Sequence, residues 1–163
     1  MERLHIRTAT LEDLEQIAAI EAACFPPEQA GSREDIRQRL TAYPNHVLVG
    51  EREGAIVCYI MGPVIEPMYI EDAMFHDTAC HRPEGLYQSV FSLAVAPAFQ
   101  RRGFGGQLLR AMADLARREG RRGVTLTCLD AKVGYYAAFG FHDHGVGGSV
   151  HGGVPWHNMV LDL

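Results

Sequence analysis

The chain has 163 residues, of which 47% are hydrophobic, and a formal net charge of −5 at pH 7. These values predict a single globular domain over residues 1–163. No apolar run approaches the ~18 residues that cross a bilayer, and the N-terminus has no signal-peptide pattern. We therefore expect no membrane contact. The acidic balance argues against nucleic-acid binding. The four cysteines include no Cys-x-x-Cys pair, which favours reduced thiols, a cytoplasmic location and no metal site.

The first half of the chain is predicted to combine short strands with two helices. Thr10 with Asp13, and Ser32 with Asp35, form the boxes that start helices. Residues 63–85 have no periodicity and are expected to form a long loop, the kind of segment that is often functional in a compact domain. Alternation and short apolar runs predict strands at 4–8, 47–49 and 55–61, the last two as a hairpin.

The second half is predicted to be mixed α/β. Its elements are a strand at 87–95, a helix at 107–119, a strand at 124–128, a short helix at 131–138 and a strand at 156–161. A helix that joins two strands favours a parallel pair. The expected fold class is therefore α/β, with a mixed central sheet flanked by helices.

The most informative stretch runs from Leu93 to Gly106. An apolar run ends at Pro97, a basic turn with glycines follows, and a long amphipathic pattern begins at Gln107. Backbone N–H groups at such a turn and at the helix start favour an anion. Glycines there permit left-handed dihedrals and close backbone approach. The stretch therefore predicts a pyrophosphate site.

The segment Val95-x-Pro97-x-x-Gln100-Arg101-Arg102-Gly103-Phe104-Gly105 resembles the acetyl-CoA motif of the GNAT superfamily of N-acetyltransferases. Tyr135-Tyr136-Ala137-Ala138-Phe139-Gly140-Phe141 resembles the late signature of the same superfamily. The resemblance implies the GNAT-type acyl-CoA N-acyltransferase fold and acetyl-CoA as co-substrate. In that superfamily the strand before the motif splays from the next one, which leaves backbone groups near the thioester.

The resemblance also assigns the residues that hold acetyl-CoA. Leu93 and Val95 are expected to contact the pantetheine and acetyl groups through their backbones, and a backbone N–H there would polarise the thioester carbonyl. The pyrophosphate site is expected to comprise Gln100, Arg101, Arg102, Gly103, Phe104, Gly105 and Gly106.

Three further segments resemble the arylalkylamine (serotonin) N-acetyltransferases. They are 22–25, 81–85, and 128–131 taken together with 139–142, and they occur in the same order along the chain. That family carries two histidines on the strand before the CoA motif, where this chain has Ser89 and Phe91. The acceptor is therefore expected to be a small aryl- or alkylamine, while the route of the amine proton stays open.

Direct transfer from a thioester to an amine needs a group that protonates the departing thiolate. By resemblance this group is Tyr136, because a phenol with a pKa of about 10 is protonated at neutral pH. An alkylammonium also has a pKa of about 10.4 and must lose a proton before it attacks. Ser89 is the candidate that would hold a water for this step, and Glu28, His81, Asp130 and His142 are weaker candidates.

Other functions remain open at the level of the sequence. The acceptor site is expected to comprise 25–32, the long loop and 145–156. The alternative enzyme function keeps the same chemistry and changes the acceptor to a protein N-terminus, a lysine or an antibiotic amine. A non-catalytic CoA-binding sensor is the third possibility. The sequence is compatible with a monomer or a homodimer. A P-loop is excluded because no Gly-Lys-Ser/Thr ending follows the glycines.

Overall fold

The structure is a computed structural model that describes residues 3–149 and 151–163, apart from the side chain of His151. The chain forms two compact units. Unit 1 comprises residues 1–62 and 92–112, and unit 2 comprises residues 63–91 and 113–163. The chain passes from one unit to the other at three points: after Gly62, after Phe91, and after Met112 within the long helix α3 (Phe104–Arg118).

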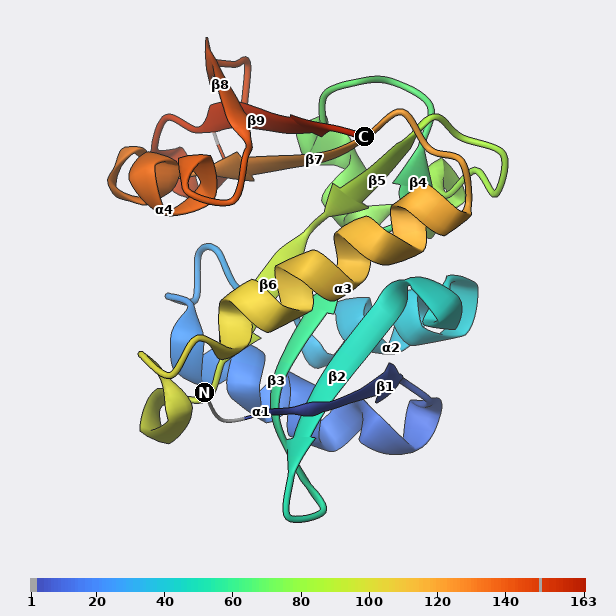
Figure 1. The fold of residues 1–163 in the computed structure, drawn as a ribbon, viewed down its shortest axis with the longest axis vertical. Coiled ribbons are helices and arrows are strands. Elements are labelled where there is room, and N and C mark those ends of the chain that lie inside the picture. The colour runs from blue at the N-terminus through green and yellow to red at the C-terminus, as the bar shows by residue number, and fades with distance from the viewer. Residues whose placement is uncertain (1–2, 150) are drawn as a thin grey trace. The chain divides into compact units, whose positions relative to one another are not determined.

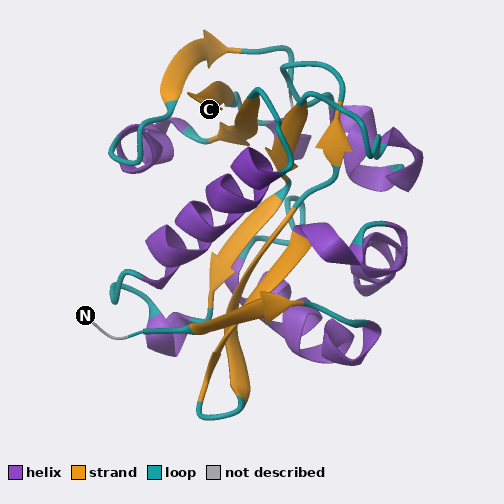
Figure 2. Ribbon diagram, turned by 45° about the vertical axis from the view of Figure 1, so that its right-hand side comes forward, coloured by secondary structure: helices purple, strands orange, loops and turns teal. Residues whose placement is uncertain are grey.

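Unit 1 contains a four-stranded antiparallel sheet in the order β1-β2-β3-β6 (Figures 1 and 2). The predicted hairpin is confirmed, and Glu53 and Gly54 form its turn with φ of 53° and 81°. The strand β6 pairs with β3 and is the last strand of this sheet. The strand bounds are His5–Thr8 for β1, Val47–Arg52 for β2, Ala55–Met61 for β3 and Ser92–Val95 for β6.

Two helices, α1 (Leu14–Cys24) and α2 (Arg33–Ala42), belong to this unit, and α1 packs against α2, β3 and β6. Both predicted capping boxes are present, at Thr10 and at Ser32. The apolar residues of the two helices and of the sheet form one core: Ala9, Leu14, Ile17, Ile20, Ile36, Leu40, Tyr43, Val47, Val49, Ile56, Tyr59, Met61 and Ala94.

Arg7 joins β1 to the start of α1. Its guanidinium donates to both carboxylate oxygens of Asp13, at 2.8 and 2.9 Å, and to Glu51 Oε1 at 2.9 Å. Asp13 is buried. The hydrogen bonds from Arg7 hold the pKa of Asp13 below its ordinary value of 3.8. The carboxylate is therefore charged and paired in the folded protein at neutral pH.

Asp13→Asn is expected to lower the free energy of unfolding by about 2 kcal/mol at pH 7, because it removes charge-assisted hydrogen bonds from a buried site. The native pKa of Asp13 is depressed, so its contribution is present above the unfolded pKa and is lost as pH falls through the native pKa. Urea unfolding of both proteins should therefore differ at pH 7 and converge in acid. The control is Asp114→Asn, which removes the exposed pair with Arg117 and should change little.

Unit 2 contains a five-stranded mixed sheet in the order β4-β5-β7-β9-β8. The strands β5 and β7 are parallel, as predicted for strands that a helix connects, and the other pairs are antiparallel. The strand β4 was not predicted, because it is only two residues long and lies in the apparent loop at 63–85. The bounds are Val64–Ile65 for β4, Tyr87–Val90 for β5, Gly123–Cys128 for β7, His142–Val146 for β8 and His157–Asp162 for β9.

Two predicted boundaries are wrong. The single strand predicted at 87–95 is two strands, β5 and β6, which belong to different sheets and are separated by Phe91. The helix predicted from Gln107 begins at Phe104, so Gly105 and Gly106 form its first turn and do not adopt positive φ. Glycine has a low helix propensity, which hid this first turn in the sequence.

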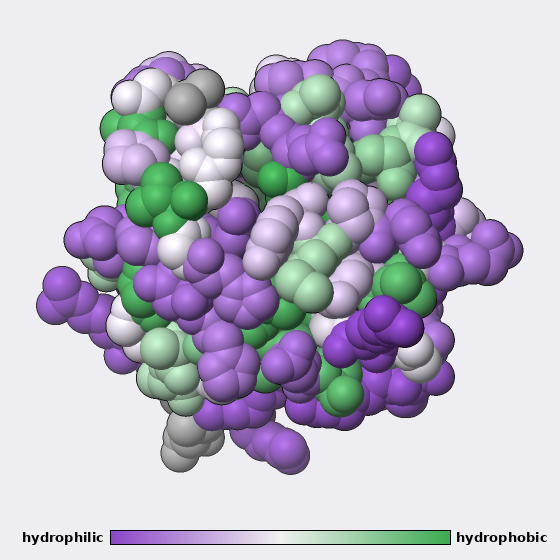
Figure 3. All heavy atoms as spheres, turned by 90° about the horizontal axis from the view of Figure 1, so that it is seen from above, coloured by the Kyte–Doolittle hydropathy of each residue, from purple (hydrophilic) through white to green (hydrophobic). Residues whose placement is uncertain are grey.

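The short helix α4 (Val133–Ala137) follows a 3₁₀ turn at Asp130–Lys132. Gly140, with φ of 96°, ends this segment and redirects the chain into β8. Hydrophilic side chains cover most of the face seen in Figure 3, and apolar residues form small separate groups there. Within residues 3–149 and 151–163, no helix has the length and apolar character needed to cross a bilayer.

Candidate functional site

The outer edge of β6 carries the peptide groups of Leu93 and Val95. The N–H of Ala96 donates to the carbonyl of Val57 at 2.8 Å, which makes these two residues a hydrogen-bonded pair. In an antiparallel ladder such pairs alternate with pairs whose peptide groups point outward. The register pairs Val95 with Cys58 and Leu93 with Ile60, so the backbone groups of Leu93 and Val95 point away from β3.

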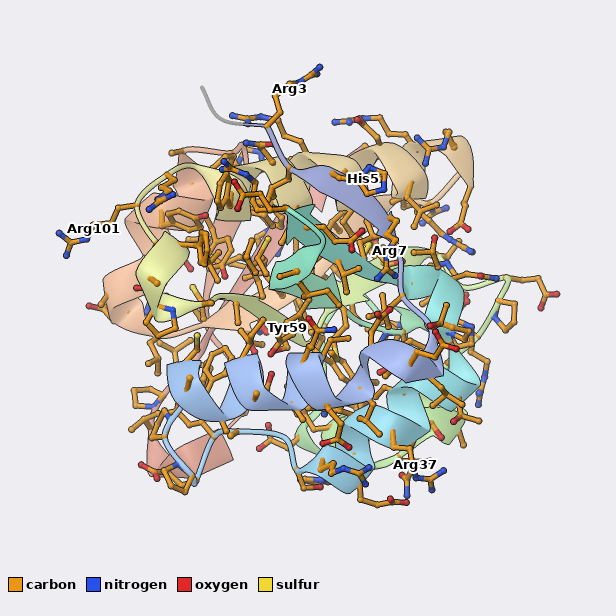
Figure 4. The ribbon with its side chains drawn as sticks, turned by 90° about the horizontal axis from the view of Figure 1, so that it is seen from below. Arg3, His5, Arg7, Arg37, Tyr59 and Arg101 are labelled. Atoms are coloured by element: carbon orange, nitrogen blue, oxygen red, sulfur yellow. The ribbon has the colours of Figure 1, made fainter. Side chains whose placement is uncertain are left out.

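The turn that follows β6 is fixed by side chains as well as by backbone conformation. Gln100 Nε2 donates to the carbonyl of Val95 at 2.9 Å and closes the turn onto the strand. Arg101 and Gly103 have φ of 65° and 82°, in the left-handed region. The Arg102 guanidinium lies over the Phe99 ring, 5.2 Å from its centroid. Figure 4 shows Arg101 pointing away from the protein.

The start of α3 presents a row of backbone donors. Gln107 N–H donates to the carbonyl of Gly103 at 3.2 Å, which closes the first helical bond. The amides of residues 103–106 precede that bond, and such amides have no acceptor within their own helix. The helix dipole adds partial positive charge at this end, and Arg101 and Arg102 are exposed beside it. Unit 1 therefore combines the outward strand edge, the left-handed turn and the helix start that the sequence predicts for an anion site.

Tyr136 lies on α4, in unit 2. Its ring packs edge-to-face on Phe141 and Tyr135, with centroid distances of 5.8 and 5.1 Å. Burial raises the pKa of Tyr136 above its ordinary value of 10, and the charges of Tyr135 and Cys128 act in the same direction. The phenol therefore stays protonated across the neutral range, the state in which it can donate a proton.

Ser89 also lies in unit 2, on β5, and is fully buried. Its hydroxyl donates to the carbonyl of Pro63 at 2.5 Å, so its proton is used within the fold. A hydroxyl keeps two acceptor lone pairs when its proton is donated. That Ser89 holds a water stays a prediction, and such a water would donate to these lone pairs.

The weaker candidates for the base occupy different settings. His81 Nδ1 accepts the N–H of Val64 at 3.1 Å, which ties the long loop to β4. Asp130 is paired with His157, whose Nε2 lies 3.1 Å from Asp130 Oδ1. Glu28 and His142 are exposed in the loop after α1 and on β8. The structure thus gives His81 and Asp130 partners within the fold.

Cys128 is a strand residue with a protonated thiol. Burial, followed by the charges of Asp143 and Asp130, raises its pKa to about 11. Because only the thiolate is a strong nucleophile, Cys128 is a poor acceptor for an acyl group at neutral pH.

The described side chains include no cluster of three metal-ligating groups, and His151 lies outside them.

His157 on β9 bridges two carboxylates. Its Nδ1 lies 3.1 Å from Asp143 Oδ1, and its Nε2 contacts Asp130. The hydrogen bond with Asp143 raises the pKa of His157 above 6.5, and Asp130 adds to this effect. The two carboxylates thus stabilise the charged ring, an arrangement that suits a structural clamp better than a base.

An NMR titration of His157 is expected to give a midpoint above 6.5, because both carboxylates favour the charged ring. A raised native pKa means that this clamp contributes fully below the unfolded pKa and is lost as pH rises through the native one. Asp143→Asn should shift the midpoint downward, while Asp162→Asn on the same strand serves as a control. A midpoint unchanged by Asp143→Asn would contradict the clamp.

One polar cluster of unit 1 was missed in the sequence. Glu21, Tyr59 and Ser92 lie together in the interior, and all are at most 4% exposed. The available signal was helical spacing, because Glu21 falls seven residues after Leu14 and four after Ile17, on the apolar face of α1.

Comparison with known proteins agrees with this geometry. A model of the acetyltransferase (GNAT) family matches residues 14–141. Serotonin N-acetyltransferase of Macaca mulatta is 33% identical over 114 residues, which cover 69% of this chain and 54% of that protein. The chain thus spans about half the length of the curated relatives it matches.

Two solved structures share the fold. A GNAT-like decarboxylase in complex with isobutyryl-CoA has a TM-score of 0.84 at 24% identity, covering 97% of this chain and 98% of that one. An acetyltransferase of Brucella melitensis in complex with acetyl-CoA has a TM-score of 0.65 at 22% identity, covering 100% and 90%. The predicted acyl-CoA N-acyltransferase fold is therefore confirmed.

Proposed function

Since the chain belongs to the acetyltransferase (GNAT) family, we propose that it transfers the acetyl group of acetyl-CoA to a primary amine. The observation that carries this proposal is the outward backbone edge of β6, which leads directly into the left-handed turn and the start of α3. A thioester needs a polarising donor, and a pyrophosphate needs several amides and positive charge. This one segment offers both.

The donor would be held almost entirely by backbone groups. Leu93 would bind the pantetheine arm as an added strand does, through its N–H and carbonyl, and Val95 through its N–H, because the Val95 carbonyl already accepts from Gln100 and Cys24. The amides of Gly103, Phe104, Gly105 and Gly106 would bind the pyrophosphate oxygens. Gln100 would shape the turn through its bond to Val95. Arg101 and Arg102 would add charge that is exposed and screened by salt.

Transfer would then proceed in one ternary complex. The amine nitrogen attacks the thioester carbon, the carbon–sulfur bond breaks, and the amine loses one proton. A backbone N–H at the edge of β6 would stabilise the oxyanion, an interaction typically worth ~3 kcal/mol in acyl transfer. Tyr136 would donate its phenol proton to the departing thiolate and regain a proton from water. The role of Ser89 would be to hold a water that accepts the amine proton.

The proposed acceptor is a small aryl- or alkylamine, supported by the similarity to serotonin N-acetyltransferases. The test is release of free CoA thiol with a panel that contains arylalkylamines, alkylamines, peptides and aminoglycosides. Turnover of the first two groups is expected. A preference for peptides or aminoglycosides would show that the acceptor is not a small aryl- or alkylamine. Tight acetyl-CoA binding without any turnover would favour a non-catalytic CoA-binding sensor.

A further inference from the structure

The carboxylate of Glu21 on α1 is the centre of a buried cluster that the proposed chemistry does not use. Glu21 is 3% exposed, and both of its oxygens accept hydrogen bonds. Oε1 accepts from Ser92 Oγ at 2.5 Å and from the hydroxyl of Tyr59, and Oε2 accepts the N–H of Gly31 at 2.9 Å. A buried carboxyl group is tolerated when its oxygens are hydrogen-bonded in this way.

Tyr59 is held in the donor state by its surroundings. Burial raises the pKa of its phenol well above 10, and the neighbouring charge of Glu21 acts in the same direction. Tyr59 Oη also lies 3.1 Å from Ser92 Oγ, because both hydroxyls converge on Glu21 Oε1 from β3 and β6. Figure 4 shows Tyr59 in the interior, beside α1.

One backbone amide of the loop between α1 and α2 is hydrogen-bonded to this cluster. The N–H groups of Gln29 and Ala30 both donate to the carbonyl of Pro26 at 2.9 Å, so the first part of the loop is a local turn. The N–H of Gly31 instead donates to Glu21. The loop is therefore attached to the interior through a side chain that lies ten residues earlier in the chain.

Gly31 also approaches the buried groups closely. A Cβ at this position would lie 3.3 Å from Arg39 Nη1 and 3.5 Å from Glu21 Oε2, the first of which is tighter than ordinary contact. Arg39 is itself buried, 4% exposed, and its Nη1 lies 3.6 Å from Met61 Sδ. The loop thus rests on a carboxylate and a guanidinium that both belong to the core.

The same turn of α1 also contacts β6. Cys24 Sγ donates to the carbonyl of Val95 at 3.2 Å, and Glu21 accepts from Ser92. These two contacts lie on either side of Leu93, whose backbone points to the outer edge of the strand. Glu21 therefore connects the loop after α1 to the strand that we propose for the donor.

We propose that Glu21 is a positioning residue that fixes the loop 26–32 against β6 for binding of the amine acceptor. The inference rests on the proposed function, in which this loop lines the acceptor site. Glu21 itself touches neither the amine nor the thioester. Its effect is to hold the Gly31 amide, and hence the end of the loop, in one place before the amine arrives, which reduces the ordering cost of binding.

The test is Glu21→Met, which keeps the length of the side chain and removes both acceptor oxygens. The KM for the amine is expected to rise at least tenfold, with kcat within threefold and the Kd of acetyl-CoA within twofold of the wild-type values. Hydrogen exchange of a peptide covering 26–32 should accelerate at least tenfold. Glu21→Asp keeps the carboxyl group but shortens the side chain, and should give smaller changes in the same direction if Glu21→Met does not fold.

Tyr59→Phe is the matched control, because it removes a partner of Oε1 and leaves the bond from Oε2 to Gly31. Its loop exchange and its KM for the amine should stay within twofold of wild type. In Glu21→Met, kcat and the binding of both substrates could instead fall equally, in proportion to the lost stability. That result would show that Glu21 is only a structural residue and would overturn the proposal. Weaker acetyl-CoA binding with unchanged loop exchange would also overturn it. Loop exchange is measured without substrate, so the absence of amine turnover would reject the proposed function separately.

Discussion

Tyr136→Phe is expected to lower kcat at least 100-fold while the Kd of acetyl-CoA stays within twofold. The variant keeps the ring and its packing on Phe141 but has no proton to donate to the thiolate, and general acids contribute about 10²–10⁴-fold. Thiol release under saturating amine and acetyl-CoA, with calorimetric binding of acetyl-CoA, measures the two quantities.

Tyr135→Phe is the control for this variant, because it removes the neighbouring hydroxyl from the same helix. Its kcat should remain within threefold. The pKa of Tyr136 is raised above 10 by burial, so activity should rise with pH as the amine deprotonates, with no decline from Tyr136 below pH 9. An unchanged kcat in Tyr136→Phe would show that Tyr136 is not the general acid and that the thiolate takes its proton from water.

Gly103→Val is expected to weaken acetyl-CoA binding at least tenfold, equivalent to about 1.4 kcal/mol. Gly103 has φ of 82°, which a β-branched residue adopts only under strain. A turn that relaxes this strain would move the amides of 103–106 away from the positions proposed for the pyrophosphate. Calorimetric titration with acetyl-CoA measures the change.

Gly54→Val is a closely matched control. Gly54 has φ of 81° in the β2–β3 turn, and a Cβ there would have no neighbour within 4 Å. The free energy of unfolding should fall by a similar amount in both variants, about 1–2 kcal/mol, because each places a valine in a left-handed backbone conformation. Weaker acetyl-CoA binding should appear only in Gly103→Val. Equal binding by the two variants would show that the turn at Gly103 does not hold the donor.

Ser89 and Phe91 do not offer a route for the amine proton through a side-chain base. Ser89 is buried and donates to Pro63, and Phe91 packs on Phe75 with centroids 4.6 Å apart. Neither side chain is a base at neutral pH. We therefore expect the amine proton to leave through water, and rates should follow the fraction of neutral amine across a series of amines of different pKa.

Local features of the fold were predictable from the sequence. The capping boxes at Thr10 and Ser32, the hairpin turn at Glu53-Gly54 and the helix end at Gly140 depend on contacts between near neighbours in the chain. Such contacts leave a residue-type signature. The parallel pairing of β5 with β7 followed from the helix between the strands. The short strand β4 did not, because two residues carry no periodicity.

The sequence by itself determined the family resemblance and the donor-binding turn, because both depend on consecutive residues from Val95 to Gly106. Tertiary structure decided three things. It divided the strand 87–95 at Phe91 between two sheets, started α3 at Phe104, and placed Glu21 between the Gly31 amide and Ser92. The physical reason is that strand pairing and the burial of a polar side chain depend on partners far apart in the chain, and no local pattern encodes those partners.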